Sequence, residues 1–178
     1  METARDAYLR MLGDELTPRL KELGFIAPTL DPRTPSPRPA FQIIGQDPGP
    51  TTAGPADLTD FRLPVPGHHV LLGLHEYWAN NSASFQFTVN ILATSHTAWA
   101  TFRAGSTDFN GNPWPSEPTT STHYGPGGPP IARLGQLMGL ADKWWYISPR
   151  RPTEPVAEEI ATAVQHHALP AINELTHP

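Results

Sequence analysis

Residues 82–94, with the sequence SASFQFTVNILAT, predict the central strand of a β-sheet. Aromatic or aliphatic side chains alternate with polar ones along this stretch, and no proline interrupts it. The apolar set is Phe85, Phe87, Val89 and Ile91, and the polar set is Gln86, Thr88 and Asn90. We therefore expect one face of the strand to pack into a core and the other to stay outside it.

Other extended segments surround this strand. Residues 70–78 predict a second strand, and residues 79–82 contain two asparagines that suit a hairpin turn. The two strands should then be adjacent and antiparallel. Residues 98–102 predict a short or bulged strand, and the aromatic run at 144–147 predicts another.

Helical patterns mark both ends of the chain. Apolar residues recur every three or four positions over residues 4–23 and 156–175. Pro18 predicts a kink near Thr17, Pro170 predicts a kink or restart, and Thr153 is a candidate cap of the second helix. Residues 131–140 predict a short helix or turn. The expected fold is a single α+β domain over residues 1–178, with two layers: an antiparallel sheet packed on one face by the N- and C-terminal helices.

Two irregular regions separate these elements. Residues 28–67 are rich in proline and predict an insertion, in which either 41–44 or 58–63 pairs as an edge strand. This insertion could be a ligand for an adaptor domain, but we favour a segment that wraps the surface. Residues 105–130 contain no dinucleotide or phosphate-loop motif, so we interpret them as a connection.

The composition excludes several classes of function. The formal net charge is −5, and no cluster of Lys and Arg suggests a nucleic-acid partner. The chain has no cysteine, which excludes disulfides, thiolate zinc sites and a thiol nucleophile. No signal-peptide pattern or long apolar run is visible, so we expect no membrane association and a cytoplasmic location. No cofactor is predicted, and the chain could be a monomer or a homodimer.

Four stretches in order carry a resemblance to a known family. They are residues 16–25 (LTPRLKELGF), 84–91 (SFQFTVNI), 132–145 (ARLGQLM and then DKWW) and 168–172 (ALPAI). Together they resemble the DUF4304 family of bacterial domains, whose function is undefined. The resemblance implies a helix, an antiparallel sheet and a closing helix. The chain departs from the family pattern in the proline-rich stretch after Phe25, and at His75, where the family pattern would have a glutamine.

Residue types that carry chemistry are present without a diagnostic arrangement. The eight histidines show no zinc-binding spacing, and no serine lies in a nucleophile elbow, so we predict no metal site and no catalytic residue. Four carboxylates from separate segments could still converge as an acid–base pair: Glu76, Asp108, Glu117 and Asp142.

The polar face of the central strand is the candidate binding site. Gln86, Thr88 and Asn90 should face away from the helices, and the neighbouring strand should add His75 and Tyr77. One of the paired tryptophans, Trp144 or Trp145, must point the same way, and Arg133 is a possible anion contact at the edge. The alternative interpretation is a solvated face, partly covered by the proline-rich segment.

Two functions therefore remain open. The first is a non-catalytic intracellular binding module, which uses the open sheet face to hold an unidentified protein or small ligand. The second is a small hydrolase-like enzyme, in which His75 and a nearby carboxylate act in a pocket closed by residues 105–130. A deep pocket at His75 would favour the enzyme, and a flat or covered face would favour the binding module.

Overall fold

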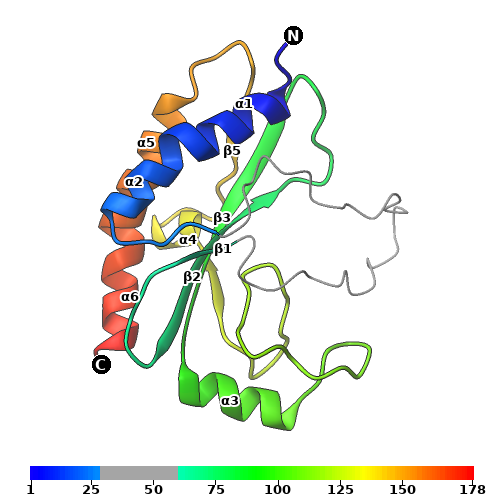
Figure 1. Ribbon diagram of the computed structural model, residues 1–178, viewed down its shortest axis with the longest axis vertical. Coiled ribbons are helices and arrows are strands. Elements are labelled where there is room, and N and C mark those ends of the chain that lie inside the picture. Colours follow the sequence, from blue (N-terminus) through cyan, green and yellow to red (C-terminus); the bar gives the residue numbers. More distant parts are fainter. Residues whose placement is uncertain (29–59) are drawn as a thin grey trace.

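The computed structural model describes residues 1–28 and 60–178, and it has an antiparallel sheet at its centre (Figure 1). Four of its five strands pair in the order β1-β2-β3-β4. The fifth strand, β5, pairs with the beginning of β3, whereas β4 pairs with a later part of β3. The strands are β1 (Asp60–Arg62), β2 (His68–Glu76), β3 (Phe85–Ser95), β4 (Ile131–Arg133) and β5 (Trp145–Ile147). The central position predicted for residues 82–94 is confirmed.

Helices from both ends of the chain lie together along one face of this sheet (Figure 1). The first run is α1 (Ala4–Arg10), η1 (Met11–Leu16) and α2 (Thr17–Glu22), and the last is α5 (Glu154–Ala163), η3 (Val164–Ala168) and α6 (Leu169–Thr176). The short α4 (Leu134–Leu137) packs beside η3, and α3 (His96–Gly105) lies on the other side of the sheet. This arrangement confirms the predicted α+β two-layer fold.

Both long helical runs contain a π-helical turn just before a proline. The turn η1 ends one residue before Thr17-Pro18, and η3 ends one residue before Leu169-Pro170. Proline lacks the backbone N–H and its ring crowds the carbonyl four residues earlier, so a wider turn replaces the regular α-helical one. The predicted interruptions therefore fall at the right places, and each is a widened turn within a continuing helix.

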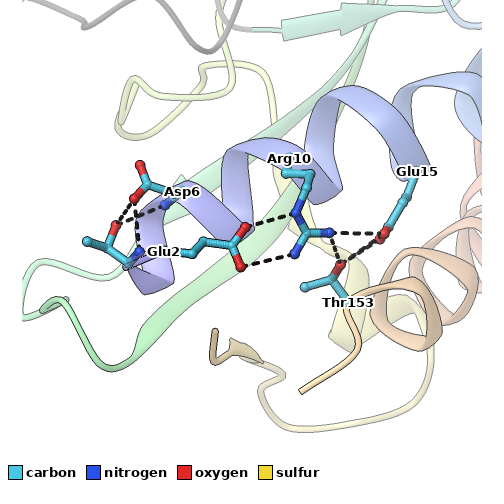
Figure 2. Close-up of polar contacts among 6 residues, drawn as sticks. Glu2, Asp6, Arg10, Glu15 and Thr153 are labelled. Carbon is cyan, nitrogen blue, oxygen red and sulfur yellow. Dashed lines mark hydrogen bonds and ion pairs between the residues drawn. The ribbon is translucent and has the colours of Figure 1, made fainter. Parts of the chain in front are cut away.

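A polar network joins the two helical runs (Figure 2). The Arg10 guanidinium lies 2.9 Å from Glu2 and 3.5 Å from Glu15, and it also donates to the hydroxyl of Thr153. Thr153 occupies the N-cap position of α5, as predicted, but its hydroxyl makes no capping bond. It donates instead to Glu15 at 2.8 Å, which ties the start of α5 to η1.

The core lies between the helices and the sheet. Its central side chains come from β3 and are at most 5% exposed: Phe85, Phe87, Val89 and Ile91. The ring of Tyr8 from α1 stacks on Phe85 with centroids 4.2 Å apart, and Trp145 of β5 stacks on Phe87 at 6.2 Å. The face predicted to be buried is therefore the face that meets the helices.

Two predictions about local structure change, and a third is confirmed. Residues 98–102 are helical and belong to α3, so the predicted strand is wrong. Residues 131–140 hold a strand, β4, before the expected short helix, α4. Within the proline-rich insertion, β1 pairs with β2 at the edge of the sheet, which confirms strand pairing in 58–63, while 41–44 lies outside the described residues.

None of the helices in the described part of the chain combines the length and the apolar character that crossing a bilayer requires.

Candidate functional site

The sheet face turned away from α1 and α5, called here the outer face, carries rows of side chains fixed by strand register. Antiparallel pairing places directly opposed residues on the same face, so each row runs across the sheet. The rows are Leu71–Leu92–Ile131, then Asp60–Gly73–Asn90–Arg133, then His75–Thr88 with Trp144 beside them, and finally Tyr77–Gln86–Tyr146. The face changes from apolar to polar to aromatic along the strands.

The apolar row is covered. Leu71 and Leu92 are 4% and 0% exposed, because α3 and residues 106–130, here called the covering segment, pack over them. Trp99 of α3 donates from Nε1 to the Ser116 carbonyl at 3.0 Å, and its ring lies 5.2 Å from that of Tyr124. The prediction that the outer face is open is therefore wrong at this end, and residues 105–130 are more than a connection.

A buried carboxylate holds the covering segment in place. Asp60 is 2% exposed and accepts hydrogen bonds from the Thr119 hydroxyl at 3.0 Å and from the Thr120 amide and hydroxyl at 2.9 and 2.6 Å. Gly73 lies directly beneath this contact, and a Cβ atom there would be 2.5 Å from Asp60 Oδ1. Sequence reasoning missed this group, although a glycine inside an apolar strand is a signal of close backbone approach.

His75 is joined to the same group. Its Nε2 lies 3.0 Å from Thr120 Oγ1, whose own proton is donated to Asp60. The single hydroxyl proton is thereby used, so Nε2 of His75 must be the donor to Thr120. Burial lowers the pKa of His75, against the opposing effect of the Asp60 charge. His75 is thus a neutral hydrogen-bond donor within the fold.

This geometry gives a pH prediction. Because the pKa of His75 is lowered in the folded protein, the unfolded chain binds more protons between its pKa of about 6.5 and the folded value. Stability should therefore be full above about pH 6.5 and fall as the pH drops through the folded value. His69, whose pKa burial also lowers, acts in the same direction. Denaturant melts at a series of pH values should show that the free energy of unfolding falls less toward acid pH in His75→Gln than in the wild type. If the two proteins lose the same stability over this pH range, His75 is not the buried neutral imidazole described here.

The acid–base hypothesis for His75 requires a pocket with a carboxylate in direct reach. Two hollows in the described part of the chain are lined by residues from the helix layer, and neither includes His75. The nearest carboxylate in its network, Asp60, is reached only through Thr120. Within the described residues, the contacts of His75 therefore join it to the fold through Thr120 and not directly to a carboxylate.

Three more of the predicted binding residues are engaged inside the fold. Thr88 is 2% exposed and donates to the Lys143 carbonyl at 2.9 Å. Asn90 Nδ2 lies 3.5 Å from the Thr120 carbonyl, and its Oδ1 is buried with no partner among the described residues. Trp145 faces the helices and is 2% exposed, so Trp144 is the one tryptophan of the pair that lies on the outer face, and Trp145 is not a binding residue there.

The hairpin end of the outer face is accessible. We define the rim as five side chains from the hairpin after β2, from β3 and from the segment around β5: Tyr77, Trp78, Gln86, Trp144 and Tyr146. Trp78 and Tyr146 are 72% and 46% exposed. The Tyr77 ring centroid lies 5.6 Å from that of Trp78 and 5.5 Å from that of Trp144. Tyr77, Gln86 and Trp144 were predicted, whereas Trp78 and Tyr146 were missed.

Trp144 is fixed in one orientation. The Arg133 guanidinium lies over its ring at 5.4 Å, and Asp142 accepts both from Trp144 Nε1 at 2.9 Å and from Arg133 at 2.7 Å. The hydrogen bond from Arg133 lowers the pKa of Asp142 most, and the bond from Trp144 lowers it further. The predicted anion contact, Arg133, therefore already has a carboxylate partner, and its visible role is to position Trp144.

The other polar candidates do not converge. Glu76 pairs with Arg5 at 3.3 Å, Glu117 pairs with Arg62, and Asp108 accepts hydrogen bonds within its own loop. Among residues 1–28 and 60–178, no group of three or more histidine, aspartate or glutamate side chains is arranged to hold a metal ion.

The fold and this face define a two-layer α+β domain with a partly covered sheet and an aromatic rim. No protein-family model matches the chain, and no curated protein or solved structure matches it either. The resemblance to the DUF4304 family stays a prediction.

Proposed function

We propose that this protein is a non-catalytic binding module whose recognition surface is the rim. The observation that carries the proposal is the combination of two exposed aromatic side chains, Trp78 and Tyr146, with a tryptophan that Arg133 and Asp142 hold in place. Tryptophan and tyrosine dominate the energetic centres of protein interfaces. An aromatic side chain that is ordered before binding loses less entropy when the partner arrives.

The shape of the rim favours a protein partner over a small ligand. Small molecules bind in hollows that bury most of their surface, whereas the two hollows identified in the described residues include no rim residue. The half-buried Gln86 amide, between Tyr77 and Tyr146 in the register, adds hydrogen-bonding capacity among the rings. An aromatic surface with one amide suits a partner of mixed polarity, and an intracellular setting is part of this proposal.

Affinity capture with matched variants tests the proposal. Three baits would be compared: the wild-type protein, a rim variant that carries both Trp78→Ser and Tyr146→Ser, and a control variant that carries Ile26→Ser. Ile26 is an exposed aliphatic residue, 55% accessible, whose backbone pairs with Arg62 away from the rim. We expect one protein to be retained by the wild type and the control, and its recovery to fall roughly tenfold with the rim variant.

The captured protein would then be purified and its footprint mapped by amide hydrogen exchange. Protection around residues 77–78 and 144–146 would support the rim as the interface. Equal retention by the wild type and the folded rim variant would contradict the proposal. Protection confined to the helix layer would contradict it as well.

A further inference from the structure

The strand β5 directs two backbone groups away from the sheet. The N–H of Gln86 donates to the Asn80 side chain at 2.6 Å, and the Gln86 carbonyl accepts from the N–H of Tyr77 at 2.8 Å, so both groups of Gln86 point toward the β2 side. Gln86 and Tyr146 are directly opposed in the register. Because bonded and non-bonded pairs alternate along an antiparallel ladder, this pair is a non-bonded one. The N–H and C=O of Tyr146 therefore point away from β3.

The other edge strands of the sheet have partners for such groups. At β1, the N–H of Arg62 donates to the Ile26 carbonyl at 3.0 Å, and the Arg62 carbonyl accepts from the N–H of Ile26 at 2.7 Å. At β4, the N–H of Arg133 donates to Oε1 of Gln136 at 3.1 Å. The backbone groups of Tyr146 have no such partner in the described part of the chain, and this residue is 46% exposed. An exposed donor and acceptor on an edge strand form a template for one more strand.

Two exposed arginines follow this edge. Arg150 and Arg151 lie in a turn after β5, in which the N–H of Arg151 donates to the Ser148 carbonyl at 3.1 Å. Neither guanidinium has an ion-pair partner among the described residues. The charged residues just before β5 are already paired: Asp142 with Arg133, and Lys143 with Glu159. This end of the edge is therefore positive on a chain of net charge −5, and acidic groups complement it.

We infer that the partner of the rim is an extended, acidic segment that adds a strand to the open edge of β5. Its backbone exchanges hydrogen bonds with Tyr146, and its alternate side chains lie on the outer face beside the rings of the rim. Its acidic residues meet Arg150 and Arg151 at the end of the strand. This inference rests on the proposed function, because it names the kind of partner that the rim would bind.

A nuclear magnetic resonance titration of the full chain with synthetic peptides tests the inference. The probe is a blocked peptide, Thr-Val-Thr-Val-Glu-Glu. Two matched peptides are the controls: one has lysine in place of both glutamates, and the other is N-methylated at its threonines and valines, so that it cannot donate backbone hydrogen bonds. The acidic peptide should shift the amide signals of residues 145–147 and bind roughly tenfold more tightly than either control. No shift at residues 145–147 up to millimolar peptide, or equal binding by either control, overturns the inference.

Two substitutions at Tyr146 separate the backbone contact from the side-chain contact. Tyr146→Ala and Tyr146→Pro both remove the ring, but only the proline removes the N–H. Because that N–H points away from β3, the proline leaves the ladder of the sheet intact. The acidic peptide should bind roughly fivefold more weakly to Tyr146→Pro than to Tyr146→Ala. Equal binding to the two folded variants overturns the inference; if the proline variant does not fold, the N-methylated peptide decides.

A variant that carries Arg150→Gln and Arg151→Gln tests the charge. It should bind the acidic peptide and the lysine peptide about equally, whereas an unchanged preference for the acidic peptide overturns the inference.

Used as a further bait in the affinity capture, this arginine variant also separates the inference from the proposed function. Loss of the captured protein from both the rim variant and the arginine variant supports the inference. Loss from the rim variant alone contradicts the inference and leaves the proposed function standing. Retention by both variants overturns the proposed function, and the inference with it.

Discussion

Phe87→Ala should lower the free energy of unfolding by about 3 to 5 kcal/mol, the usual cost of removing a buried phenylalanine side chain. Phe87 is fully buried near the start of β3, with its ring 5.0 Å from that of Tyr8 and 6.2 Å from that of Trp145. The substitution leaves a cavity between the sheet and the helices, which the rigid strand cannot close. Chemical denaturation measures the difference in the free energy of unfolding, with one denaturant dependence (m value) fitted to both proteins.

His75→Ala is the matched control for this substitution. His75 pairs with Thr88, the residue next to Phe87 in β3, and its side chain lies on the outer face. The substitution removes its hydrogen bond to Thr120. The expected cost is about 1 kcal/mol, and the fold should stay intact. Equal losses in the two variants would contradict the assignment of the faces, because the assignment makes only one of these side chains part of the main core.

Gly73→Ala should cost about 3 kcal/mol, by overpacking and by loss of buried hydrogen bonds. A methyl group at this position would overlap Thr120 Oγ1 and approach Asp60 Oδ1 to 2.5 Å, so the covering segment must move away from the sheet. Gly13→Ala is the control, because a Cβ atom on that helical glycine meets nothing within 4 Å. The control should be neutral or slightly stabilising. Denaturant melts compare the two.

A double-mutant cycle locates the cause of the Gly73→Ala effect. Thr120→Ala removes the hydroxyl that the new methyl group would strike, at the cost of its bonds to Asp60 and His75. The loss in the double variant should therefore be smaller than the sum of the two single losses. Additive losses would show that the methyl group does not act through Thr120.

The main features of the fold could be read from local patterns. The alternation in residues 82–94 is unambiguous, because its apolar positions lie on one face and a one-residue shift would expose all of them. The terminal helices followed from repeats of three and four residues. The opposed directions of Trp144 and Trp145 also followed from strand geometry, although the choice between them needed the register of Phe87 with Trp145.

Residues 98–102 were misassigned because a segment of five residues with mixed apolar side chains fits either structure. The local signal that decides the matter is Ser95, whose hydroxyl accepts from the Ala98 amide at 3.0 Å and caps α3. Trp99 then packs onto Leu71 and Leu92, which a strand in that place would not allow.

The cover on the outer face could not be predicted, because its contacts join distant parts of the chain. Asp60 and Thr120 are separated by 60 positions, and neither lies in a recognisable motif. For the same reason His75, Thr88 and Asn90 were expected to face solvent, whereas two of them contact the covering segment and Thr88 contacts Lys143. Only the residues at the hairpin end kept the accessibility that alternation alone implied.

The covering segment closes the outer face as far as His75 and leaves the rim as its accessible part. Hydrogen exchange of the Thr120 amide tests this most directly, because that N–H is buried and donates to Asp60 Oδ2 at 2.9 Å. We predict slow exchange at Thr120, comparable to the amides of β3, and faster exchange after Asp60→Ala. Exchange at the rate of an unstructured peptide in the wild type would contradict the account. It would mean that the covering segment is detached and that the outer face is accessible beyond the rim.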